Sequence, residues 1–194
     1  MNFAVPKEVT AVSSPLREAG FEAYLVGGCV RDLLIGKTPK DWDVTTNATP
    51  GQIQGIFPDS FYENDYGTVG VKNGSEDPTL HIVEVTPYRT ESSYSDRRRP
   101  DKVEFGQSLE DDLARRDFTI NAIALDESKG HIVDPYKGQE DLKAKVLRTV
   151  RDPEERFEED GLRLMRAVRL VAELNFALDS DTAAAIQKKA EYLS

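Results

Sequence analysis

The pattern of apolar and polar positions divides the chain into two parts. Up to residue 148, short β-prone segments alternate with short helical ones, which is typical of a mixed α+β unit. The predicted strands are 21–26, 42–46, 61–62, 68–72, 80–88 and 131–134, and the predicted helices are 7–19, 29–35, 50–57 and 109–114. Residues 118–125 fit a helix or a strand, and the polar, aperiodic segment 90–102 predicts a loop.

From residue 152 onward the pattern is helical. Apolar residues recur every three positions, and others widen the same face: Leu162, Met165, Val168 and Val171, with Ala167, Leu170 and Leu174. A last helix is predicted at 180–192, begun by capping residues around Asp179. Because two helices are a small basis for an independent domain, we expect a head domain at 1–148 and a helical neck at 149–194 that starts a larger helical region.

Composition narrows the class of protein. The chain has 194 residues, of which 39% are hydrophobic, enough to bury a core. It has no apolar stretch of the ~20 residues that cross a bilayer and no signal-peptide pattern, so we expect a cytoplasmic protein. One cysteine and two histidines argue against a disulfide framework or a Cys- or His-rich metal site, so any metal would be held mainly by oxygen.

The charge of the chain is acidic, whereas its arginines are clustered. Twenty-five Lys and Arg against 35 Asp and Glu give a net charge of −10. Such a chain has no bulk attraction to nucleic acid, so any contact with a polyanion must be local. The clusters are Arg97–Arg99, Arg115–Arg116, and the helical set Arg163, Arg166 and Arg169. Ordinary solvated surface charge is the alternative interpretation.

A pair of glycines separates the first predicted strand from the next helix. Gly27 and Gly28 would let a phosphate approach the backbone, and Arg31 in the helix adds a planar donor group. A tight strand-to-helix turn without a ligand is an equally good explanation. The GxGxxG pattern is absent, so a dinucleotide-binding fold is not supported.

Two aspartates open the second predicted strand. Asp41 and Asp43 lie two positions apart, so their carboxylates project from the same face of a strand. Like charges at ~5–7 Å repel unless a cation lies between them, and Mg²⁺ prefers carboxylate oxygens and substrate phosphates. Glu84, the charge in an otherwise apolar strand, supplies a third acid for a two-metal site. The alternatives are a solvated turn for the aspartates and a solvent-facing strand position for Glu84.

Several motifs in a fixed order carry a resemblance to a known family. They are LVGGCVRD at 25–32, KDWDV at 40–44, EVTPYR at 84–89, RRDFTINA at 115–122, DP at 134–135 and EDGLRLMRAVR at 159–169. The chain resembles the head and neck of class II tRNA nucleotidyltransferases and bacterial poly(A) polymerases, within the polymerase-β-like nucleotidyltransferases. The resemblance implies an α+β head with a mixed, five-stranded type of sheet and helices, followed by an all-helical neck.

The resemblance also implies roles for the motif residues. Those implied for catalysis and Mg²⁺ are Asp41 and Asp43, with Glu84 assisting. Those implied for the triphosphate are Gly27, Gly28 and Arg31. Those implied for the ribose and the rest of the nucleotide are Arg116, Asp117 and Asn121. Those implied for the base are Asp160 and Arg163, supported by Arg166 and Arg169.

The implied function is addition of C and A, from CTP and ATP, to the 3′ end of tRNA. A loop at 90–102 is tied in the family to addition of the final A, which disfavours a CC-only enzyme. An A-adding enzyme or a poly(A) polymerase of the same family stays open, and so does a non-catalytic nucleotide- or RNA-binding module. The intact acidic residues argue against the module. The net charge of −10 predicts weak tRNA binding by this chain alone.

Hydrogen-bond chemistry predicts which bases are accepted. Asp160 can only accept and Arg163 can only donate, and one turn apart on a helix they would present an acceptor beside a donor. Cytosine and adenine offer an amino donor beside a ring-nitrogen acceptor, and uracil and guanine offer the reverse. The pair therefore predicts use of CTP and ATP and rejection of UTP and GTP. A plain helix ion pair between Glu159 and Arg163 is the alternative.

Overall fold

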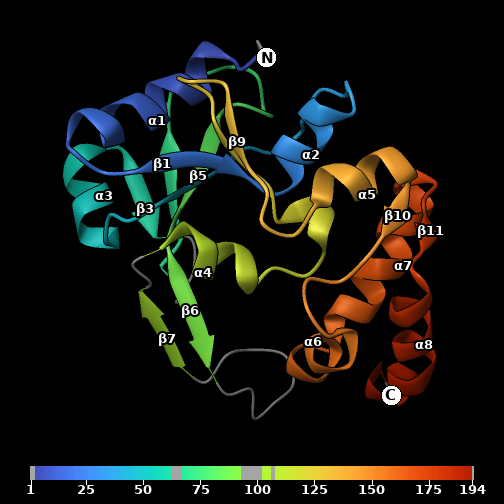
Figure 1. The fold of residues 1–194 in the computed structure, drawn as a ribbon. Helices are drawn as coiled ribbons and strands as arrows, with labels where there is room; N and C mark the ends of the chain where they lie inside the picture. Colours follow the sequence, from blue (N-terminus) through green and yellow to red (C-terminus); the bar gives the residue numbers. More distant parts are fainter. Residues whose placement is uncertain (1–2, 63–66, 93–101, 106–107, 194) are drawn as a thin grey trace.

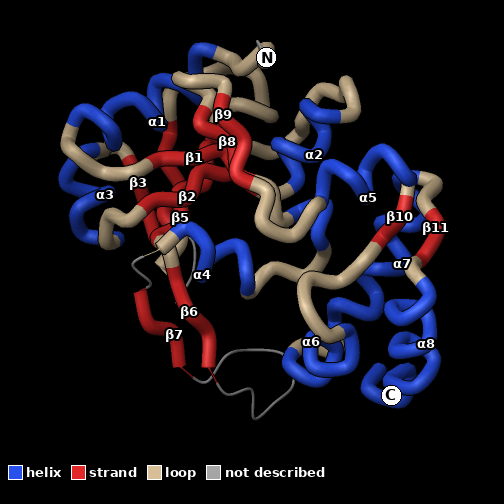
Figure 2. The backbone as a smooth tube through the Cα atoms, in the orientation of Figure 1, coloured by secondary structure: helices blue, strands red, loops and turns tan. Residues whose placement is uncertain are grey.

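The computed structural model describes residues 3–62, 67–92, 102–105 and 108–193. Within these ranges the strands of a mixed sheet gather in the centre of the head, with helices around them (Figure 2). The C-terminal helices lie together beside the head (Figure 1).

The main sheet has seven strands among the described residues, in the spatial order β3-β4-β5-β2-β1-β8-β9. Strands β2 and β5 pair in parallel, and the other neighbours pair antiparallel. The bounds are β1 Ala23–Val26, β2 Asp43–Thr46, β3 Ser60–Tyr62, β4 Val69–Lys72, β5 Ile82–Pro87, β8 Ala124–Asp126 and β9 His131–Val133. The sheet is thus wider than the expected five-stranded type, because β3 and β9 add an edge strand on either side.

Helices cover the sheet and continue beyond it. In the head they are α1 Lys7–Glu18, α2 Gly28–Leu34, α3 Pro50–Ile56, α4 Leu109–Ala114, the 3-10 turn η1 Thr119–Asn121 and α5 Gly138–Ala144. The C-terminal ones are α6 Pro153–Glu159, α7 Leu162–Leu174, α8 Ser180–Lys189 and the 3-10 turn η2 Ala190–Leu193. None of the helices in the described ranges has both the length and the apolar composition needed to cross a membrane.

The two faces of the sheet differ because successive strand residues point in opposite directions. Val44 of β2 points into the larger buried cluster, together with Val12 of α1 and Ile53 of α3. Asp43 and Thr45, on either side of Val44, point to the opposite face, where Thr45 hydrogen-bonds α4. The alternation therefore places apolar packing on one face of β2 and polar chemistry on the other.

Helix α7 is built into the core of the head. Ala167 and Leu170 on one side of α7 belong to the same buried cluster as the sheet. Leu164 packs instead with Phe157 of α6 and Ala185 of α8. The short strands β10 (Val146–Leu147) and β11 (Ala177–Leu178) pair in parallel and join the two parts further. The division into a head and a neck at residue 148 stays a prediction.

The loop predicted at 90–102 is wrong at both ends. Strand β6 (Arg89–Ser92) pairs antiparallel with β7 (Lys102–Phe105), and this hairpin extends away from the main sheet (Figure 1). Thr90, Glu91, Ser92 and Lys102 are all polar, so the sequence pattern gives no strand signal at these positions. Residues 93–101, with the cluster Arg97–Arg99, lie outside the described residues.

Helix α5 is not predicted by the sequence pattern. The preceding Lys137 has a left-handed conformation, with φ 58°. The carboxylate of Asp134, further back, accepts hydrogen bonds from the N–H groups of Gly138 and Gln139 at 2.7 and 2.9 Å. A helix capped from this distance lacks the usual capping residue directly before it. The ambiguous segment 118–125 contains both η1 and β8.

Candidate active site

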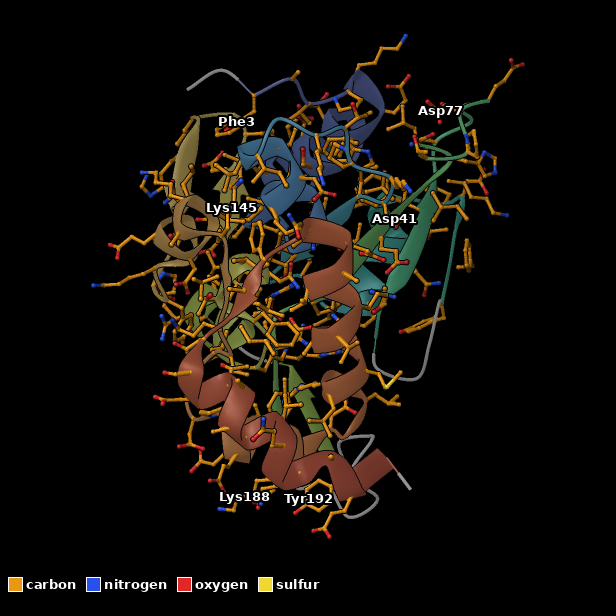
Figure 3. All side chains as sticks on the ribbon, turned by 90° about the vertical axis from the view of Figure 1, so that its right-hand side faces the viewer. Phe3, Asp41, Asp77, Lys145, Lys188 and Tyr192 are labelled. Atoms are coloured by element: carbon orange, nitrogen blue, oxygen red, sulfur yellow. The ribbon has the colours of Figure 1, made fainter. Side chains whose placement is uncertain are left out.

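A pocket of about 560 Å³ lies where α2, the segment before β2 and α7 meet. Asp41 lies beside α7 (Figure 3). The walls combine cationic, acidic and apolar side chains. They are formed by Gly28, Cys29, Arg31, Asp32, Lys37, Thr38, Lys40, Asp41, Asp43, Asn121, Arg166, Arg169, Leu170, Glu173 and Leu174.

The turn between β1 and α2 depends on Gly27. Its φ of 81° lies in a region that side chains rarely adopt. A Cβ at this position would lie 3.1 Å from Nη1 of Arg116 and 3.3 Å from Oδ2 of Asp43. The missing side chain therefore makes room for a guanidinium and a carboxylate at the same turn.

The two aspartates line the same pocket, although Asp41 does not share a strand with Asp43 as expected. Asp41 is exposed in the segment before β2, and Asp43 is the half-buried first residue of β2. Burial raises the pKa of Asp43, and Asp41 raises it further, whereas Arg116 and Arg166 lower it. The negative charge of Asp43 is therefore costly in the absence of a cation.

The donor set of the pocket fits a hard cation. Asp41 and Asp43 offer carboxylate oxygens, and their mutual repulsion is what a divalent ion would relieve. Glu84 is the register partner of Asp43 in the parallel β2–β5 pair, which places it on the same face of the sheet. Glu84 does not line the pocket, and the described residues contain no group of three or more acidic, His or Cys side chains that could hold a metal.

Four of the predicted nucleotide-binding residues form one hydrogen-bonded chain. Arg166 of α7 donates to buried Asp117, with the closest contact at 2.6 Å. Asn121 donates to the same carboxylate at 3.3 Å, and its own amide oxygen accepts from Arg31 at 3.0 Å. Although burial opposes ionisation, Arg166 and these hydrogen bonds lower the pKa of Asp117. These hydrogen bonds connect α7 with α2, which both line the pocket.

Arg116 follows α4 by two residues, and a fully buried carboxylate of that helix holds it. Asp112 accepts from Arg115 at 2.6 Å and from Arg116 at 3.0 Å. Burial opposes ionisation here too, but Arg116 and Arg115 lower the pKa of Asp112. Arg116 does not itself line the pocket, and it reaches the site at the Gly27 turn.

The structure does not arrange Asp160 and Arg163 as predicted. Asp160 is extended, with φ −142° and ψ 104°, between α6 and α7, and it accepts a hydrogen bond from Leu162 N–H at 2.9 Å. Arg163 is buried and donates to the carbonyl oxygen of Arg156 and to Glu159 at 3.0 and 2.6 Å. The two are therefore not one turn apart on a helix, because the chain breaks at Asp160 to begin α7.

Cys29 lines the pocket but offers it no reactive group. Its thiol is buried and donates to the carbonyl oxygen of Val26 at 3.2 Å. Burial, with the nearby Asp43, raises the pKa of Cys29 to about 12. The thiol is therefore protonated at neutral pH and is a poor nucleophile.

The pocket unites most of the predicted site. Of the predicted residues, those lining it are Gly28, Arg31, Asp41, Asp43, Asn121, Arg166 and Arg169. Three more lie next to lining residues without lining the pocket themselves: Gly27, Arg116 and Asp117. Those that do not line it are Glu84, Asp160 and Arg163. Sequence reasoning missed Lys37, Thr38, Lys40 and Glu173. The closeness of the two lysines to Asp41 in the chain was a signal that could have found them.

Comparison with known proteins identifies the family of this chain. Residues 23–148 match the model of the Poly A polymerase head domain. The chain belongs to the Poly A polymerase head domain family. This confirms the resemblance seen in the motifs.

Relatives of this head domain include two CCA-adding enzymes. The one from Lactobacillus helveticus (strain DPC 4571) is 50% identical over 183 residues, which are 94% of this chain and 44% of that protein. The one from Geobacillus stearothermophilus is 46% identical over 189 residues, which are 97% of this chain and 45% of that protein. The chain thus spans less than half the length of these relatives.

Solved structures share the fold of this Poly A polymerase head domain chain. The CCA-adding enzyme of Bacillus stearothermophilus in complex with CTP aligns with a TM-score of 0.85 and 42% identity over 97% of this chain and 45% of that one. A tRNA nucleotidyltransferase complexed with a primer tRNA and an incoming ATP analog aligns with a TM-score of 0.73 and 32% identity, over 93% and 50%. The predicted nucleotidyltransferase head fold is therefore confirmed.

Proposed function

We propose that this chain carries the nucleotide-binding and catalytic site of a CCA-adding tRNA nucleotidyltransferase. The observation that carries the proposal is that Asp41 and Asp43 share one pocket with Arg31, Arg166 and Arg169. Acidic residues beside several cations suit a substrate that is a metal-bound polyphosphate. The relatives named as CCA-adding enzymes, and the related structures with CTP and with tRNA plus an ATP analog, support the substrates.

The proposed reaction is attack of an RNA 3′-hydroxyl on the α-phosphate of CTP or ATP. The bond to the β-phosphate breaks, and pyrophosphate leaves. Asp41 and Asp43 would hold Mg²⁺, which activates the attacking hydroxyl and neutralises charge on the triphosphate when bound. Arg31, Lys37 and Lys40 would bind phosphate oxygens, since they reach the same pocket. The roles of these residues and the identity of the metal are part of the proposal, as is a cytoplasmic location.

The proposed base selection needs a local rearrangement. Arg163 is committed to Glu159 and to the carbonyl oxygens of Arg156 and Arg115. To read a base together with Asp160, it would have to exchange at least one of these contacts for the base. Use of CTP and ATP with rejection of UTP and GTP stays a prediction, checked by offering each triphosphate separately.

The test is to incubate a tRNA lacking its CCA end with CTP and ATP and to sequence the RNA 3′ ends. The 194-residue chain is assayed beside a full-length CCA-adding relative, because it spans only 44–45% of such relatives. We expect C, C and A to be added in order, with release of pyrophosphate. Addition of A alone would favour the A-adding or poly(A)-forming alternative, to which the family match also points. Nucleotide binding without pyrophosphate release would favour a non-catalytic module.

A further inference from the structure

Asp112 is a fully buried carboxylate that the proposed reaction does not use. One of its oxygens, Oδ1, accepts from Nε and Nη2 of Arg115 at 2.9 and 2.6 Å. The other, Oδ2, accepts from Nη2 of Arg116 at 3.0 Å and lies 3.3 Å from the hydroxyl of Thr45, whose one proton is shared with the carbonyl oxygen of Thr86 at 3.1 Å. Both oxygens of Asp112 are therefore engaged, and the contacts come from two different elements, the α4 end and β2.

These contacts connect the strand of the catalytic aspartate to the guanidinium at the glycine turn. Thr45 follows Asp43 by two residues on the same face of β2. While Nη2 of Arg116 binds Asp112, its Nη1 faces the Gly27 turn. Within the described residues, Nε of Arg116 is buried without a hydrogen-bond partner. The direction of this guanidinium thus depends on Asp112.

We propose that Asp112 is a positioning residue for nucleotide binding, which holds Arg116 so that one of its terminal nitrogens faces the incoming triphosphate at the Gly27 turn. The proposal rests on the proposed function, and on the role as a nucleotide contact that the family resemblance implies for Arg116. A carboxylate at this position fixes the guanidinium with a charge-assisted hydrogen bond, which a neutral side chain reproduces only weakly. Asp112 acts through Arg116 and does not touch the nucleotide itself.

A double-mutant cycle tests this coupling. CTP binding with Mg²⁺ is measured for the full 194-residue chain and for Asp112→Asn, Arg116→Ala and the double variant. We expect either single change to raise the Kd for CTP about tenfold, and the double variant to bind no more weakly than Arg116→Ala. Glu110→Gln, an exposed carboxylate on the same helix, is the matched control and should keep the original Kd. An unchanged Kd for Asp112→Asn, or losses that multiply in the double variant, would overturn the proposal.

Thermal unfolding shows whether Asp112→Asn folds. If it does not, a second pair of variants tests the same coupling. Thr45→Val removes the hydroxyl that Asp112 and the carbonyl oxygen of Thr86 share, and Thr45→Ser keeps it. We expect Thr45→Val alone to raise the Kd, by about threefold, and to add nothing in the Arg116→Ala background. An additive effect there, or equal effects of Val and Ser, would contradict the positioning role.

A measurement without nucleotide separates this proposal from the proposed function. The ¹⁵N signals of the Arg116 side chain report on how its guanidinium is held. They should change in Asp112→Asn, or in Thr45→Val if that variant is needed, and stay unchanged in Glu110→Gln. If the original chain binds no CTP, the proposed function fails while this result still stands. If the Arg116 signals do not change, the positioning role fails whether or not CTP binds.

Discussion

Gly27 satisfies two independent requirements, whereas Gly28 next to it satisfies neither. Gly27 has a positive φ, and a Cβ there would press against the side-chain ends of Arg116 and Asp43 at 3.1 and 3.3 Å. Gly28 has ordinary helical backbone, and a Cβ there would lie no closer than 3.7 Å to the guanidinium of Arg31. We therefore expect Gly27→Ala to lower the unfolding free energy by about 1–3 kcal/mol and to weaken CTP binding.

Gly28→Ala is the matched control for this prediction. It should keep the stability of the fold, so that any loss of CTP binding reports on contact with the nucleotide alone. Urea unfolding and a CTP titration of both variants check the difference. Equal destabilisation by the two substitutions would contradict the assignment of Gly27 as the constrained position.

The carboxylate of Asp43 should lower the stability of the folded chain but be required for nucleotide transfer. Its raised pKa means that folding disfavours its charged form, so at neutral pH it destabilises the folded chain. Asp43→Asn should therefore raise the melting temperature in EDTA while abolishing nucleotide transfer. Mg²⁺ should raise the melting temperature of the original chain more than that of the variant.

The exposed Asp59 supplies the control for Asp43. Asp59→Asn should leave the melting temperature, the response to Mg²⁺ and the transfer activity unchanged. Thermal melts with EDTA and with Mg²⁺ make the comparison. A variant at Asp43 that responds to Mg²⁺ as strongly as the original chain would contradict its role as a ligand.

At the scale of elements, the close packing of α5 on η1 supports the site. A Cβ on Gly138, the first residue of α5, would lie 2.2 Å from the carbonyl oxygen of Thr119 in η1, the element that carries Asn121. Gly138→Ala should therefore destabilise the fold by about 1–3 kcal/mol. Gly55→Ala in α3 meets no atom within 4 Å and should stabilise by about 0.5–1 kcal/mol. Urea unfolding of both variants checks the opposite signs.

The sequence predicts the elements whose signals are local. The helix at 109–114 is found with its observed bounds, because Ser108 caps it from the position directly before it. The strand with Asp43 and Thr45 is found because its alternation matches a two-faced sheet. Helix α5 is missed because its cap is remote, and the β6–β7 hairpin is missed because residues 90–92 and 102 are all polar.

The candidate site shows the same limit at the level of side chains. Asp43 and Arg31 line the pocket, since a short strand and a tight turn fix their directions, and Asp41 lines it from the segment before β2. The position of Arg163 depends instead on the approach of α4 to α7, where it bonds the carbonyl oxygen of Arg115. No spacing within one helix specifies such a contact between distant elements.

At the scale of the whole molecule, acid should weaken the fold through its buried carboxylates. Burial opposes ionisation of Asp117, but Arg166 and its hydrogen bonds hold its pKa below the ordinary value of 3.8. Because the folded pKa is the lower one, this stabilisation is present above pH 3.8 and is lost as the pH falls through the folded pKa. Asp117→Asn should thus cost roughly 1–3 kcal/mol at neutral pH, and less with acidification.

Urea unfolding of the original chain and of Asp117→Asn, at a series of pH values from 7 down to about 3, checks this sign. The two curves of unfolding free energy should approach each other at the acid end. Asp59→Asn should run parallel to the original chain throughout. A gap between the original chain and Asp117→Asn that grows with acidification would contradict the lowered pKa.

The net charge of −10 coexists with a pocket rich in cations. Its arginines have acidic neighbours within the protein: Arg31 pairs with Asp32, Arg166 with Asp117 and Arg169 with Glu173. Pairing keeps these arginines in place without adding net positive charge to the surface. Attraction of a triphosphate to the pocket would therefore come from how these arginines are placed and not from the net charge of the chain.

The link between Asp117 and Arg166 bears on how members of this family could exchange parts by recombination. A C-terminal half taken from another member would have to bring an arginine at the position of Arg166 and a small side chain at that of Ala167. Without the arginine, Asp117 becomes a buried charge without its ionic partner, at the carboxylate to which Asn121, the acceptor for Arg31, also donates. The success of chimaeras joined after residue 148, where the family match ends, should follow these two positions and not overall identity.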